Sequence, residues 1–83
     1  MKYNFPALLK EDKDNPRYTI ISFPDLLGIG SQCEVGRELE VAKEVLELAL
    51  STAINRTVEP TDVEVLKKYH PNCDVILVEV DID

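Results

Sequence analysis

The sequence predicts one α+β domain, a two-layer sandwich in which a mainly antiparallel sheet of three or four strands carries one long and one short helix. Residues 3–9, 18–23 and 74–83 are β-like runs, and in the first and last of them apolar residues alternate, which is the period of a strand with one buried face. Between the last two stretches they recur every three or four positions, as in an amphipathic helix. The 83 residues suffice for a single core, so residues 1–83 are interpreted as one domain. The predicted order is ββ(β)ααβ.

The first two strands are expected to form a hairpin. The segment 11–17 is rich in Asp, Asn and Pro, the residues of turns, so the run Tyr18–Phe23 should fold back on the first strand. Pro24 then lacks a backbone donor and predicts a loop, followed by a short third strand around residues 29–32. The buried positions expected on the first strand are Tyr3, Phe5, Ala7 and Leu9.

The two helices are predicted from periodicity and capping. A helix of about five turns should begin at Glu34, include Gly36 in its first turn and place Glu38 near the positive end of its dipole. Thr61-Asp62-Val63-Glu64 fits a capping box with Thr61 as the N-cap, which predicts a short helix to about Tyr69. The apolar stripe predicted for the long helix is Val35, Leu39, Ala42, Leu46, Ala49 or Leu50, and Ala53.

The last strand, Asp74–Asp83, is expected to have one apolar and one acidic face. Ile76, Val78, Val80 and Ile82 alternate with Glu79, Asp81 and Asp83. The strands also carry apolar residues of opposite parity, so the second face of the sheet should be partly apolar. Where the short helix leaves it uncovered, this face is a candidate for self-association or partner binding. The apolar residues expected on this second face are Leu8, one of Ile20 or Ile21, and Val75 with Leu77.

The charge predicts the class of partner. Nine basic residues against sixteen acidic ones give a net charge of −7, which disfavours a surface that neutralises phosphates. We therefore expect no direct binding to nucleic acid, and one interpretation of the acidity is steering towards basic proteins. The alternative is that the acidity serves only solubility. Because so short a chain buries little surface, a homo-oligomer is also expected.

The cysteines and the hydropathy indicate location. Cys33 and Cys73 form neither a disulfide framework nor a zinc-ligand spacing, so they are interpreted as free thiols in a reducing cytoplasm. The chain has no apolar run near the roughly 20 residues that a membrane helix needs and no leader-like start. We expect a cytoplasmic protein that does not enter the membrane.

Catalytic patterns are weak in this sequence. Glu79, Asp81 and Asp83, with Asp25 nearby, could hold a divalent metal ion, but consecutive same-side positions of one strand are about 7 Å apart. A solvated or protein-binding face is therefore favoured over a metal site. His70 is the single histidine and has no nucleophile at a known motif spacing. We expect neither enzymatic activity nor a cofactor.

One set of segments resembles the HicB-like antitoxin family along nearly the whole chain. These segments are Tyr3-Asn4-Phe5-Pro6-Ala7, the run from Tyr18 to Ser22-Phe23-Pro24-Asp25-Leu26-Leu27-Gly28, the helical stretch Glu38 to Leu46, Pro60-Thr61-Asp62, and the closing VILVEVDID. The chain departs from the family pattern at Leu27, where a second proline is usual, at Cys33-Glu34, where Gly-Asp is common, and in a loop before the helix that is one residue shorter.

The resemblance implies a partial RNase H-like fold without catalytic carboxylates. It also implies a binding module that neutralises a small basic mRNA-cleaving toxin, of the HicA-like kind, by covering its active surface. No separate DNA-binding domain is expected in this chain. The alternatives are an orphan HicB-like assembly module without a toxin, and a residual metal-dependent nuclease of RNase H type. The residues expected at the partner surface are Asp25, Leu26, Glu38, Glu79 and Asp81.

Overall fold

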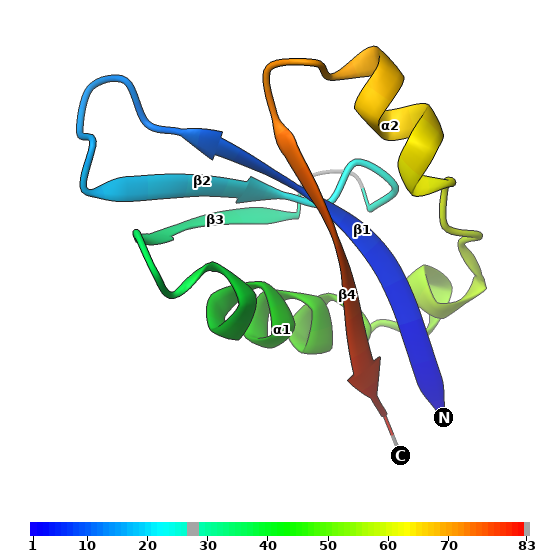
Figure 1. The fold of residues 1–83 in the computed structure, drawn as a ribbon. Coiled ribbons are helices and arrows are strands. Elements are labelled where there is room, and N and C mark those ends of the chain that lie inside the picture. Colours follow the sequence, from blue (N-terminus) through cyan, green and yellow to red (C-terminus); the bar gives the residue numbers. More distant parts are fainter. Residues whose placement is uncertain (27–28, 83) are drawn as a thin grey trace.

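Four strands and two α-helices make up the chain in the computed structural model, which describes residues 1–26 and 29–82 (Figure 1). The α+β prediction is confirmed at this level, with an antiparallel sheet and two helices. Leu27, Gly28 and the predicted last strand residue Asp83 lie outside the described residues. The elements are β1 (Lys2–Glu11), β2 (Tyr18–Ser22), β3 (Gly30–Glu34), α1 (Glu38–Ala49), the 3-10 helix η1 (Ala53–Thr57), α2 (Val63–Tyr69) and β4 (Asp74–Asp81).

The sheet has the order β3-β2-β1-β4, and each neighbouring pair is antiparallel. β1 is central, with Leu9 opposite Ile21 of β2 and Phe5 opposite Val78 of β4. The predicted hairpin joins β1 and β2 through a turn in which the Asn15 amide donates to Asp12 O at 3.2 Å. β3 and β4 are therefore the two edges of the sheet among the described residues.

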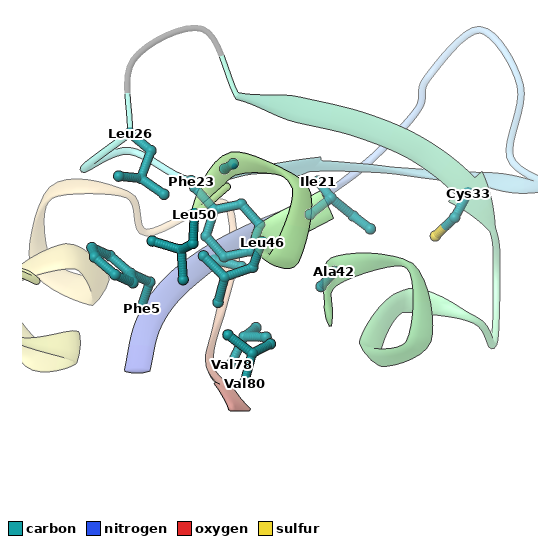
Figure 2. Close-up of a cluster of buried hydrophobic side chains, with 12 residues drawn as sticks. Phe5, Ile21, Phe23, Leu26, Cys33, Ala42, Leu46, Leu50, Val78 and Val80 are labelled. Atoms are coloured by element: carbon teal, nitrogen blue, oxygen red, sulfur yellow. The ribbon is translucent and has the colours of Figure 1, made fainter. Parts of the chain in front are cut away.

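The main core lies between α1 and one face of the sheet (Figure 2). α1 contacts all four strands, and its buried side chains interlock with the odd-numbered residues of β1 and the even-numbered residues of β4. Apolar burial of this kind contributes about 25 cal/mol per Å². The buried members of the core are Phe5, Ala7, Ile21, Phe23, Leu26, Cys33, Ala42, Leu46, Ala49, Leu50, Val78 and Val80.

The long helix is shorter than the sequence predicted. Glu34 belongs to β3, where it pairs with Tyr18, so the helix begins at Glu38 and not at Glu34. Gly36 is in a turn with φ +101°, a conformation that an α-helix excludes and that glycine adopts readily. The predicted stripe is consequently wrong at its start, where Val35 and Leu39 are 60% and 52% exposed. It is also wrong at its end, since Ala53 begins η1.

The N-cap of α2 is Asp62, one residue later than the predicted Thr61. The Asp62 carboxylate accepts a hydrogen bond from the Glu64 amide at 2.8 Å, which satisfies one of the unpaired donors of the first turn. The Thr61 hydroxyl is directed elsewhere and donates to Asp25. Because a charged carboxylate is a stronger acceptor than a hydroxyl, Asp62 takes the capping position.

The second face of the sheet is covered in part. Leu8 and Leu66 are buried yet lie outside the main core, and the alternation of β1 places Leu8 on the face opposite Ala7. α2 contacts β4. Ile20, not Ile21, is the residue of β2 on this face, and it is 41% exposed, while Leu77 of β4 is 55% exposed. Two apolar side chains of this face, one on each side of β1, thus remain accessible.

Candidate protein-binding surface

The five residues predicted for a partner surface come from three separate places. Asp25 and Leu26 follow β2, Glu38 opens α1, and Glu79 and Asp81 are on β4. The contacts of each place determine what its side chains can offer to a partner.

Asp25 and Leu26 hold the loop after β2 in place. One Asp25 carboxylate oxygen accepts from the Thr61 amide at 2.9 Å, and the other accepts from the Thr61 hydroxyl at 2.5 Å. This pair of hydrogen bonds ties the loop to the segment that leads into α2. Leu26 is 1% exposed and packs in the main core. The Leu26 side chain therefore has no surface to present to a partner.

Glu38 stabilises the start of α1. Its Oε2 accepts from the Gly36 amide at 2.6 Å, at a helix end whose N-cap, Arg37, provides no side-chain cap. Arg37 instead donates to Glu40, with Nη2 and Oε1 3.0 Å apart. This hydrogen bond and the adjacent positive charge lower the pKa of Glu40. An acidic first turn also agrees with the sign of the helix dipole.

Glu79 and Asp81 face solvent on β4. Glu79 Oε1 is 3.6 Å from Lys2 Nζ, and Asp81 Oδ1 is 2.9 Å from the N-terminal ammonium of Met1. All four groups are more than half exposed, and ion pairs in such positions contribute little free energy. The two carboxylates thus remain available to a partner that brings its own positive charge.

The structure does not bring the residues of the nuclease alternative together. Within residues 1–26 and 29–82, no group of three His, Cys, Asp or Glu side chains could hold a metal ion. Asp25 is hydrogen-bonded to Thr61, while Glu79 and Asp81 lie beside Lys2 and the N-terminal ammonium of Met1. Asp83, a further member predicted on the same strand, is outside the described residues.

The open edge of β4 was missed by the sequence interpretation. The Ile82 amide donates to Met1 O at 2.8 Å, and antiparallel ladders alternate bonded and non-bonded pairs. Tyr3 is opposite Val80, so the backbone N–H and C=O groups of the even-numbered residues of β4 are directed towards β1. The backbone groups of the odd-numbered residues face outwards, and we call Leu77, Glu79 and Asp81 the β4 edge. Alternation along one strand cannot reveal whether that strand is central or at an edge, so no signal in the sequence identified it.

The two cysteines are free thiols in different surroundings. Cys33 of β3 is 5% exposed, and burial, followed by the nearby Glu38, raises its thiol pKa although Arg37 acts in the opposite direction. A thiol with a raised pKa is a poor nucleophile near neutral pH. Cys33 is therefore a small apolar residue of the core.

Comparison with known proteins adds no relative. No protein-family model, curated protein or solved structure matches this chain. In the described part of the chain, no helix has the length and apolar character to cross a membrane.

Proposed function

We propose that this chain is an antitoxin-type binding module that neutralises a small basic mRNA-cleaving toxin, of the HicA-like kind, by covering its active surface. The activity is contact alone, and the module itself cuts no bond. The partial RNase H-like character of the fold and the cytoplasmic location belong to the same proposal. The chain is also proposed to form a homo-oligomer.

The observation that carries the proposal is the β4 edge. Leu77, Glu79 and Asp81 place one apolar and two anionic side chains in a row, all at least 55% exposed. Together with a net charge of −7, this row is complementary to a positively charged surface. A ribonuclease toxin needs such a surface to hold RNA phosphates.

The resemblance to HicB-like antitoxins supports the proposal from the sequence side. Its Phe23-Pro24-Asp25-Leu26 segment has a structural part in this molecule, because Phe23 and Leu26 are core residues and Asp25 binds Thr61. We therefore assign partner contact to the β4 edge, keep Glu38 at the start of α1 as a separate acidic position, and do not assign contact to the loop after β2.

Coexpression tests the antitoxin activity. The small basic protein encoded next to this chain, where one is present, is expressed alone and together with it. Growth arrest by the basic protein alone, relief on coexpression and copurification of the two proteins are the expected results. Persistent arrest with both proteins present at equal amounts would refute the proposal. An inactive variant of the basic protein that still copurifies serves as the control for expression.

An orphan assembly module is the second candidate, favoured by the exposed apolar residues Ile20 and Leu77 on the second face of the sheet. Sedimentation velocity over a range of concentrations distinguishes it from the first. An oligomer that forms without any basic partner and is lost in an Ile20→Asp variant would support this candidate. A strict monomer would eliminate it, and with it the homo-oligomer expected above.

A further inference from the structure

We propose that the β4 edge is a strand-addition site, at which an extended segment of a basic partner pairs with Leu77–Asp81 as a fifth strand. The inference rests on the proposed function for the identity of the partner, and it specifies how that partner is held. Its own evidence is the pairing pattern of the sheet and the charge of β4.

The first step is the backbone. Each residue at an outward position has an N–H and a C=O group directed away from β1, and within the described residues no hydrogen bond from another element reaches Leu77 or Glu79. Such a row of unpaired groups is a template for another strand. Figure 1 shows α2 beside the first half of β4, while the second half continues past it towards the C-terminus. Leu77, Glu79 and Asp81 are each at least 55% exposed, so we take Leu77–Asp81 as the accessible part.

The second step is the side chains. Leu77, Glu79 and Asp81 are at alternate positions, so they project from one face of the sheet at the edge where the added strand would lie. Directly opposite residues of paired strands have Cβ atoms about 4.5–5.5 Å apart. A strand with Lys or Arg at every second position would thus place positive charges beside Glu79 and Asp81. Its backbone N–H and C=O groups would form hydrogen bonds with the outward backbone groups of the β4 edge.

The third step selects a basic partner over a second copy. β4 carries the three carboxylates of Asp74, Glu79 and Asp81 and no basic residue. Pairing of two β4 edges would bring like charges together, which is destabilising in cross-strand pairs. The overall charge of −7 adds to this repulsion.

The other edge strand supplies a matched comparison. Just beyond the two ends of β3, the Val35 amide donates to Arg17 O at 2.9 Å, and the Phe23 amide donates to Ile29 O at 3.2 Å. The same alternation therefore directs Gln32 outwards. This strand is shorter, and its exposed side chains include no large apolar residue. It tests whether any open edge suffices.

A peptide binding experiment tests the inference without a toxin. The probe is a capped peptide of about seven residues that alternates lysine and valine, titrated into the full chain and followed by amide hydrogen exchange. The controls are the same peptide with a central proline and a peptide that alternates glutamate and valine. We expect the Leu77, Glu79 and Asp81 amides to exchange fast in the free chain and to become protected by the lysine peptide alone.

Two edge prolines give the sharpest variants. Because the Leu77 amide faces outwards, Leu77→Pro removes no bond to β1 but blocks strand addition, and it should weaken peptide binding about tenfold or more. Gln32→Pro places the same residue at the outward position of β3 and should leave binding within about twofold. The charge reversal Glu79→Lys with Asp81→Lys needs no proline and should exchange the preference from the lysine peptide to the glutamate peptide.

Three results would overturn the inference. One is protection on a strand other than β4, and another is unchanged binding by both the Leu77→Pro and the charge-reversed variants. The third is protection of the β4 edge amides in the free chain that increases with protein concentration, which would assign the edge to a second copy. If the toxin is neutralised and copurifies equally with Leu77→Pro, the binding mode fails while the proposed function stands. If peptide binding succeeds and no toxin is neutralised, the reverse holds.

Discussion

Asp25 illustrates how a single carboxylate connects two distant segments. It accepts two hydrogen bonds from Thr61 in a partly buried position, so its loss leaves the Thr61 amide without its partner. We expect Asp25→Ala to lower the free energy of unfolding by about 1–3 kcal/mol, measured by urea denaturation.

Thr61 provides the controls for this residue. Thr61→Val removes the hydroxyl at constant shape and should lower the free energy of unfolding. Thr61→Ser keeps the hydroxyl donor and should lower it by less. Combining Asp25→Ala with Thr61→Val should give less than the sum of the two effects, since both changes remove the same interaction. Strictly additive effects would show that the pair does not interact.

Cys33 gives a prediction on pH. Its raised thiol pKa means that the folded state disfavours the thiolate relative to the unfolded state, whose pKa is near the ordinary value of 9.0. The stability associated with the neutral thiol is therefore complete below that pH and decreases as the pH rises through the folded pKa. The difference in unfolding free energy between the parent chain and Cys33→Ala should shrink above about pH 9.

Thiol reactivity provides an independent measurement. Iodoacetamide should modify the partly exposed Cys73 before the buried Cys33, and mass spectrometry of the digested protein distinguishes the two sites. Unfolding in urea should remove the difference, which serves as the control. Equal rates in the folded chain would contradict the core position of Cys33.

Among the elements, α1 carries the clearest contrast between buried and exposed positions. Leu46 is fully buried, whereas Leu48, two residues along the same helix, is 76% exposed. Leu46→Ala should lower the unfolding free energy by about 2–5 kcal/mol, because it leaves a cavity in the core. Leu48→Ala should change it by less than about 0.5 kcal/mol. Urea denaturation of both variants checks the packing face of the helix, and similar losses would show that the face is misassigned.

The elements also show what periodicity could predict. Alternation identified β1 and β4, and the turn residues before Tyr18 indicated β2. The three-four spacing identified Ala42, Leu46 and a choice between Ala49 and Leu50, all of which are buried. The predicted start of α1 was wrong for local reasons. Glu34 pairs with Tyr18 in the β3 ladder, and the positive φ of Gly36 prevents the helix from starting earlier. η1 has no buried residue, so no apolar pattern was present to predict it.

At the scale of the whole molecule, the charge governs association. If a basic partner is steered by the net charge of −7, the association rate should decrease steeply between low and physiological salt, because the screening length falls to about 8 Å. The dissociation rate should change far less. Stopped-flow mixing at several salt concentrations measures both rates, and an association rate independent of salt would exclude electrostatic steering.

The candidate surface was predicted only in part, and the reason is topological. Composition indicated an acidic contact surface, and the alternation of the last strand placed Glu79 and Asp81 on one face. The strand order, which makes β4 an edge, depends on pairings between residues about seventy positions apart and has no local signature. Asp25 and Leu26 were selected from a motif, and motif residues can serve the fold as well as binding.

The pairing of β1 with β4 joins the first strand of the chain to the last. β1, β2, β3 and α1 precede β4 in the sequence, so until β4 pairs with it, β1 carries Phe5 and Ala7 on a strand that still lacks one neighbour. Contacts between such distant residues slow folding, since a long loop must close before they form. Pairing of β4, and not the early hairpin, therefore completes the core, and protection from proteases should begin only when Val78 and Val80 have joined the sheet.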